Sequence, residues 1–255
     1  MYGMRGGLLV ALAAVAACDA RLGPMSSSNS DVDAAGGGSN NDASSSTTTD
    51  APTSSAACAN GRVVYLEFEG VALAQASGAS DATKNKAVWL GVASATLTKF
   101  RPNATDRTQQ IADVTSLVKQ KLANIPQVTV VTTRPAAGPY FMVGFGDVHT
   151  TANVPYLYAV NRLDCGDSAT KSDLAWVFED APTTQKAADF AVGSILFGLG
   201  ATGTNDVNDC MCGWLTPCQP SNTPCTLGTA ETASLQCPNQ TNPQNEVQIL
   251  QNFCQ

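Results

Sequence analysis

Apolar and mainly polar residues alternate at residues 62–70 (RVVYLEFEG), and this period of two predicts a β-strand. One side of the expected strand is apolar and carries Val64, Leu66 and Phe68. The other side carries Tyr65, Glu67 and Glu69. We therefore expect a strand whose two faces differ in this way.

Further along, apolar residues recur at the spacing of a helix between residues 106 and 124. Asp106 and Gln109 stand at the spacing of a capping box where this helix would begin. The apolar stripe consists of Ile111, Val114, Leu117, Val118 and Leu122. The pattern predicts a long helix that covers a sheet with this stripe.

Four more short apolar runs predict strands at residues 127–135, 139–146, 155–161 and 173–180. A second long helix follows them, and a short helix is expected near residues 245–253. Strands and helices in this order predict an α/β (α+β) fold, a mixed twisted sheet with two long helices packed against it. A cysteine-rich C-terminal tail completes the predicted domain, which would span residues 58–255.

The first 18 residues have the composition of a signal peptide, with Arg5 before an apolar run at residues 8–17. The run ends in Val-Ala-Ala-Cys18, which resembles the lipobox of bacterial lipoproteins. This resemblance implies cleavage before Cys18, lipid (palmitate) modification of that cysteine, and a membrane anchor in the cell envelope that faces the periplasm or the exterior. The alternative is an ordinary secretory signal that contains a cysteine. Residues 19–57 are rich in Ser, Thr, Gly, Asn and Asp and predict a disordered tether.

Eight cysteines remain when Cys18 is set aside, an even number that suits four disulfides in an exported chain. These are Cys58, Cys165, Cys210, Cys212, Cys218, Cys225, Cys237 and Cys254. Zinc ligation is the alternative for the closely spaced Cys210, Cys212 and Cys218, and the pairing cannot be deduced from spacing. The net charge of −7 argues against nucleic-acid binding, which needs a basic face.

The second long helix raises a question of its own. It would open at Asp180 and Pro182 and run to about Leu199. A glycine costs a helix interior about 1 kcal/mol relative to alanine. This helix and its end nevertheless carry three of them, Gly193, Gly198 and Gly200. Glycines that merely let a buried helix approach the sheet are one explanation, and a functional site is the other.

The segment at residues 188–211 (ADFAVGSILFGLGATGTNDVNDCM), together with the order of elements, resembles the metzincin branch of zinc metallopeptidases. The resemblance implies that the zinc site has been lost: Phe190 and Ser194 stand in the places of the first two histidines, Ala191 in that of the glutamate. Ala201 stands near the third ligand, where the spacing is one residue longer than in the family, and Met211 stands for the methionine of the Met-turn. His149 is the chain's single histidine, so one subunit cannot supply three imidazoles.

The resulting expectation is a catalytically inactive, metzincin-like surface lipoprotein without a cofactor, which binds a protein or peptide. We expect its cleft along residues 155–161, floored by Phe190, Ala191 and Ser194. An active peptidase with an unconventional metal site and a structural envelope protein are the alternatives. Asp206 and Asp209 offer oxygen ligands to calcium, or belong to an Asx-rich turn.

Overall fold

The computed structural model describes residues 61–252 except 215, 231, 235 and 239–241. The predicted signal peptide, lipidation site Cys18 and tether lie outside the described residues. In the part that is described, no helix combines the length and the apolar character needed to cross a membrane.

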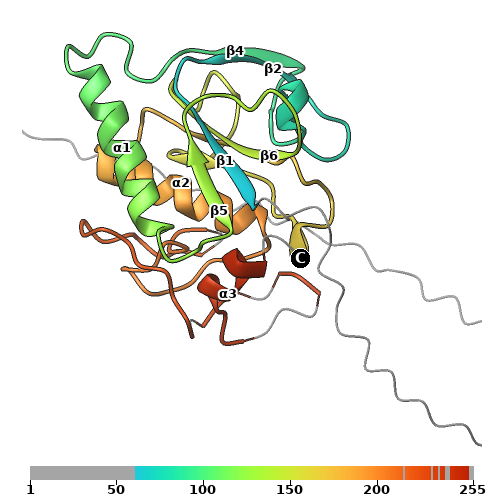
Figure 1. Ribbon diagram of the computed structural model, residues 1–255, viewed down its shortest axis with the longest axis vertical. Helices are drawn as coiled ribbons and strands as arrows, with labels where there is room; N and C mark the ends of the chain where they lie inside the picture. The colour runs from blue at the N-terminus through green and yellow to red at the C-terminus, as the bar shows by residue number, and fades with distance from the viewer. Residues whose placement is uncertain (1–60, 215, 231, 235, 239–241, 253–255) are drawn as a thin grey trace, which may run out of the picture. The chain divides into compact units, whose positions relative to one another are not determined.

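A five-stranded sheet forms the centre of the domain (Figure 1). Its strand order is β5-β1-β6-β8-β7, and the first four of these strands are parallel. The last strand, β7, is an edge strand that pairs antiparallel with β8. The strands are β1 (Arg62–Glu67), β5 (Val128–Val131), β6 (Tyr140–Phe145), β7 (Ala159–Val160) and β8 (Leu174–Val177). All five lie within segments that the sequence predicted as strands.

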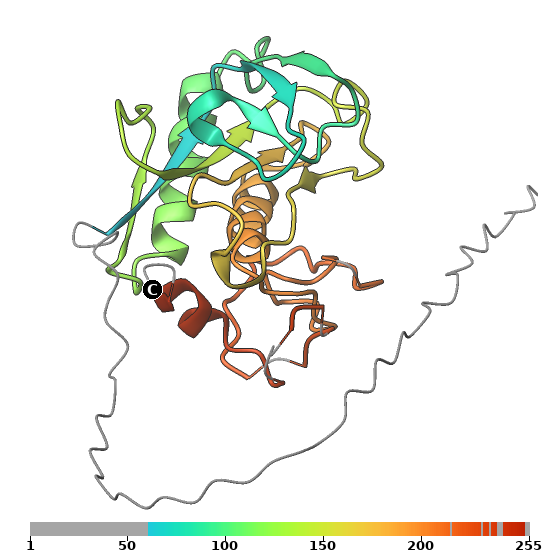
Figure 2. The same cartoon turned by 90° about the vertical axis from the view of Figure 1, so that its right-hand side faces the viewer.

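Helices α1 (Arg107–Lys121) and α2 (Thr184–Gly198) lie side by side against one face of this sheet (Figure 2). Their apolar side chains and those of the sheet form the larger of two buried clusters. A buried ion pair joins the two helices, with Lys121 Nζ 3.0 Å from Asp189 Oδ1. The mixed α/β class with two long helices is therefore confirmed.

The opposite face of the sheet carries a second sheet that the sequence did not predict. Its strands are β2 (Val71–Gln75), β3 (Lys86–Ala87) and β4 (Ser94–Leu97), in the order β3-β2-β4, and the short helix η2 (Ala82–Lys84) lies beside them. They are short, and Ala, Ser and Thr dominate them, so they give no clear period of two. This sheet closes a second apolar cluster over β1, β6 and β8.

The second sheet buries the more polar side of β1 as well. Tyr65 and Glu67 are only 6% and 7% exposed. The Tyr65 hydroxyl donates a hydrogen bond to Glu67 Oε2, and the Glu69 backbone N–H donates to Glu67 Oε1 at 2.6 Å. A central parallel strand covered on both faces needs such partners for any polar side chain it carries.

The predicted start of α2 needs correction, and so does the capping bond predicted for α1, although Asp106 does occupy the N-cap position of α1. Thr183 is the N-cap of α2, and its hydroxyl accepts a hydrogen bond from Lys186 N at 3.1 Å. Asp106 makes no capping bond to the backbone of α1; its carboxylate instead accepts from the Gln110 side chain at 2.7 Å. Asp180 lies before the cap and faces His149.

The chain after α2 is largely irregular and ends in α3 (Glu246–Gln251), the predicted short helix. Two disulfides lie within this part, Cys210–Cys225 and Cys212–Cys218, and a third, Cys165–Cys237, ties it to the loop after β7. The prediction of a disulfide-rich tail is confirmed for these six cysteines. Cys58 and Cys254 lie outside the described residues.

Candidate functional site

Close packing and backbone conformation explain the glycines of α2. A Cβ at Gly198 would overlap the Asp173 carboxylate and the Phe141 ring, and one at Gly193 would overlap the Trp214 indole. Gly200 has φ of +95° and follows the last turn as the left-handed residue of a Schellman motif. Its N–H donates to Phe197 O at 3.1 Å, and Ala201 N donates to Leu196 O at 3.0 Å. The glycines therefore admit neighbouring side chains and end the helix.

The positions matched to the metzincin zinc site lie in different surroundings. Phe190 is half-buried, and its ring reaches a cleft. Ala191, Ser194, Ala201 and Met211 have no solvent exposure. The prediction that Ala191 and Ser194 floor the cleft is therefore wrong. Neither residue lines the cleft: Ala191 points about 100° around the helix from Phe190, and Ser194, one turn after Phe190 on the same side of α2, is covered completely.

The cleft has a volume of about 450 Å³ and runs along the segment that leads into β7. One wall is formed by residues 155–161, the floor by Phe190 and Phe197 of α2, and the opposite wall by residues Gly213, Trp214, Thr216 and Pro217. A second hollow of about 390 Å³ shares Tyr158, Phe190, Gly213, Thr216 and Pro217 with the first. The two hollows form one continuous surface, which we call the β7 groove. Its course along residues 155–161 and over Phe190 is as the sequence predicted.

Aromatic side chains dominate the β7 groove. Tyr158 stacks on Phe190 with ring centroids 5.1 Å apart, and Phe197 lies 5.0 Å from Trp214. Tyr156, Leu157 and Tyr158 are 51%, 45% and 38% exposed, a concentration of large apolar side chains on one short segment. Contiguous exposed apolar surface of this kind is typical of binding sites.

The wall formed by β7 also presents free backbone groups. Phe178 N donates to Tyr158 O at 2.8 Å, and Val160 lies opposite Trp176 in the antiparallel register. Because the bonding direction alternates along an antiparallel strand, the N–H and C=O of Ala159 point away from β8. Among the described residues no strand lies on this outer side, since β7 is last in the sheet order.

Asn161 holds the end of β7 over α2. Its side-chain amide donates to Ser194 O at 2.9 Å and to Asp173 Oδ2 at 3.1 Å. Burial raises the pKa of Asp173 to about 7, and the charges of Asp164 and Asp167 add to this effect. Asn161, Asp173 and α2 thus form one buried polar contact beneath the groove.

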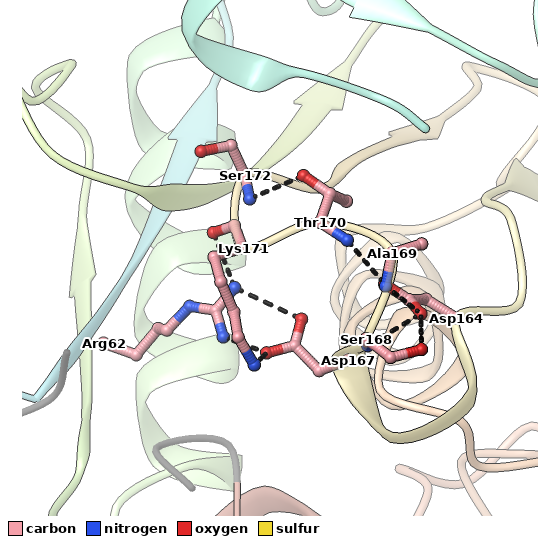
Figure 3. Close-up of polar contacts among 8 residues, drawn as sticks. All are labelled: Arg62, Asp164, Asp167, Ser168, Ala169, Thr170, Lys171 and Ser172. Carbon is pink, nitrogen blue, oxygen red and sulfur yellow. Dashed lines mark hydrogen bonds and ion pairs between the residues drawn. The ribbon is translucent and has the colours of Figure 1, made fainter. Parts of the chain in front are cut away.

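The loop after β7 is fixed by a second set of polar contacts (Figure 3). The Asp164 carboxylate accepts backbone hydrogen bonds from Ser168, Ala169 and Thr170 at 2.9–3.1 Å. The Asp167 carboxylate pairs with Arg62 of β1 and, at 2.7 Å, with Lys171. These contacts hold the loop against the sheet, so the edge strand is anchored at its C-terminal end.

The opposite wall belongs to the disulfide-linked tail. The Cys212–Cys218 bond closes a loop of six residues' separation that contains Trp214, Thr216 and Pro217. The Thr216 hydroxyl donates to Thr204 O at 2.9 Å and ties this loop to the chain that leaves α2. No signal in the sequence pointed to Trp214, which this loop places against Gly193 and Phe197 of α2.

Other candidate residues lie outside the groove. His149 Nδ1 is 3.1 Å from Asp180 Oδ2, and neither residue lines the groove. Asp206 is exposed and forms an Asx turn by accepting from Asn208 N at 2.9 Å, whereas Asp209 is buried. Within the described ranges no three His, Cys, Asp or Glu side chains gather as a metal cluster.

Comparison of the chain with models of known protein families finds no match, and comparison with curated proteins finds no significant similarity.

Proposed function

We propose that this protein binds an extended peptide segment in the β7 groove and does not cleave it. The observation that carries the proposal is the combination of an unpaired sheet edge with an aromatic groove directly beside it. A peptide added as a strand gains affinity from main-chain hydrogen bonds and specificity from pockets for alternate side chains.

The outward N–H and C=O of Ala159 supply the main-chain bonds in this arrangement. Every second side chain of the peptide then points toward the floor formed by Phe190 and Phe197, beside the Trp214 wall. The lining carries apolar and aromatic surface, so these side chains are apolar or aromatic.

The absence of cleavage rests on the resemblance to metzincins and on the residues at the matched positions. Phe190, Ala191 and Ser194 offer no imidazole and no carboxylate on this helix. A peptidase of that family needs those groups to hold zinc and to activate water. The envelope location and lipid anchor, expected from Cys18, would place the groove outside the cytoplasm.

Selection from a library of displayed random peptides tests the proposal. The selected sequences should share apolar or aromatic residues at alternate positions and should remain intact after long incubation with the protein. Ala159→Pro removes the outward N–H, which an edge strand tolerates, and should weaken binding about tenfold or more. Ala136→Pro, in an exposed turn that does not line the groove, is the matched control and should bind as the parent does.

Cleavage of the selected peptides would support the alternative of an active peptidase. Failure to enrich any peptide, or equal binding by the Ala159→Pro variant, would contradict the proposed use of the β7 edge.

A further inference from the structure

A single charged side chain, that of Lys186, lines the described part of the β7 groove. Lys186 is half-buried and lies in the hollow that also contains Tyr158 and Phe190. The other lining residues of both hollows are apolar, aromatic or uncharged polar. Among the described residues no Asp or Glu lines the groove, and none forms an ion pair with Lys186. The groove therefore carries one positive charge without a counter-ion from the described part of the chain.

The contacts of Lys186 within the protein do not neutralise this charge. Its ammonium group donates a hydrogen bond to Ser221 O, which is a neutral acceptor, and a lysine ammonium has three donors. Asp189, on the same helix, pairs with Lys121 instead. Lys186 also lies in the first turn of α2, where the helix dipole disfavours a positive charge. The charge of Lys186 therefore adds nothing to the stability of the helix that carries it.

The spacing along α2 matches the repeat of an extended peptide. Lys186 lies one turn before Phe190, and Phe197 lies two turns after it, so the three side chains share one side of the helix. The rise of an α-helix places Lys186 about 6 Å from Phe190 along the helix axis. Side chains on one face of an extended peptide repeat at about 7 Å. A peptide side chain two residues from the one that lies on Phe190 therefore comes level with Lys186.

Two contacts between β7 and α2 give the direction of the groove. Tyr158 stacks on Phe190, and Asn161 donates to Ser194 O, so the β7 segment and α2 run the same way. Lys186 therefore lies at the end of the groove where the β7 segment begins. Antiparallel pairing is the more frequent arrangement of neighbouring strands. A peptide that pairs with β7 in this way has its C-terminal end on the Lys186 side.

We infer that Lys186 makes the β7 groove selective for peptides with a carboxylate on the C-terminal side of the residue that lies on Phe190. An Asp or Glu two residues further along, or the peptide's own C-terminus, supplies this carboxylate. Either source forms a charge-assisted hydrogen bond with the ammonium group. The net charge of −7 otherwise disfavours acidic partners, so the preference has to come from this position. The inference rests on the proposed peptide binding and states which peptides are preferred.

Selection on the full chain tests the preference with two libraries of displayed random peptides, one with free C-termini and one in which a linker follows the peptide. The linker library should yield Asp or Glu two positions after an apolar or aromatic residue. The other library should also yield peptides that end at this position, which distinguishes the two sources of the carboxylate. Selection on Lys186→Gln should keep the alternate apolar residues and lose the acidic preference, whereas Lys186→Arg should keep both.

Synthetic peptides then give the size of the effect. A selected peptide with Glu at this position should bind the parent about fivefold more tightly than its Gln counterpart at low salt. The difference should shrink at high salt, because ions screen a partly exposed pair. Lys186→Gln should bind both peptides equally. Lys119→Gln, on the exposed side of α1 and away from the groove, is the matched control and should keep the preference for Glu.

Equal binding of the Glu and Gln peptides by the parent would overturn the role of Lys186. If Ala159→Pro still weakened both peptides, the proposed use of the β7 edge would stand without it. Equal loss of the preference in Lys119→Gln would show that the overall charge of the protein acts, and not Lys186. Enrichment of no peptide would remove the inference together with the proposed function. If Lys186→Gln does not fold, the two peptides on the parent at low and high salt decide, because an uncharged groove gives no preference.

Discussion

The sheet with its two helices and the tail after α2 are held together in different ways. The first region buries large apolar side chains from regular elements, including Phe141, Phe145 and Trp176, in two clusters on either face of the central sheet. The tail has one short helix, two internal disulfides, a third disulfide to the loop after β7, and a buried polar cluster around Asp209 and Glu246. The tail buries few large apolar side chains, and covalent links and paired polar groups stabilise it instead. The β7 groove lies where the two regions meet, with one wall from each.

The largest expected effect is in the apolar region. Phe141 is fully buried between α2 and the sheet, so Phe141→Ala should lower the free energy of unfolding by about 3–5 kcal/mol. Denaturant unfolding measures this loss. Tyr156→Ala, at a 51% exposed position, is the control and should change stability by less than about 0.5 kcal/mol. If both variants lost less than about 0.5 kcal/mol of unfolding free energy, the apolar clusters would not be the main source of stability in this region.

The next effect concerns the tail. Cys210 and Cys225 are 15 residues apart in the sequence, and their disulfide closes the loop between them. Replacing both by serine should lower the free energy of unfolding by about 3 kcal/mol. The tail should become sensitive to proteases while amides of β1 and β6 keep their protection against hydrogen exchange. Simultaneous loss of protection in both places would contradict the division into two differently stabilised regions.

A pH dependence should report on the contact beneath the groove. Since burial raises the pKa of Asp173 to about 7, its side chain binds a proton in the folded protein that the unfolded chain releases near its ordinary pKa of 3.8. The stability it contributes is fully present below pH 3.8 and falls as pH rises toward 7, by about 1.4 kcal/mol per pH unit. Asp173→Asn should flatten this part of the stability profile, measured by denaturant unfolding at several pH values. An unchanged slope in the variant would show that Asp173 is ionised when folded.

The smallest effect distinguishes the observed helix cap from the predicted one. Thr183→Ala removes the hydroxyl that accepts from Lys186 N and should cost about 1 kcal/mol. Asp106→Ala removes no backbone cap and should cost less, about 0.5 kcal/mol or below. Thermal or denaturant unfolding of both variants gives the comparison, and the reverse order would restore Asp106 as a cap.

Periodicity in the sequence was sufficient where an element is long or strongly apolar. It predicted α1, α2, α3 and the five strands of the central sheet. It failed for β2, β3 and β4, because strands of two to five residues rich in Ala, Ser and Thr show no pattern against which a buried face stands out. The burial of Tyr65 and Glu67 depends on this second sheet, so the pattern of β1 alone could not predict it.

Only part of the β7 groove was predicted from the sequence. Phe190 was placed beside residues 155–161 because the resemblance to metzincins implies a groove between this helix and an edge strand. The direction of Ala191 and Ser194 depends on how α2 rotates against the sheet, which the sequence does not reveal. Trp214 and the Asp209–Glu246 pair depend on contacts across the irregular tail, and no local pattern encodes such contacts.

The central claim is that a peptide pairs with the outer edge of β7, and hydrogen exchange at the Ala159 amide tests it most directly. Amide exchange is measured residue by residue with and without a selected peptide at saturating concentration. Our proposal predicts strong additional protection at Ala159, little change at Val160, whose amide already faces β8, and an intact peptide at the end of the experiment. Binding that leaves the exchange rate of Ala159 unchanged would contradict strand addition at this edge.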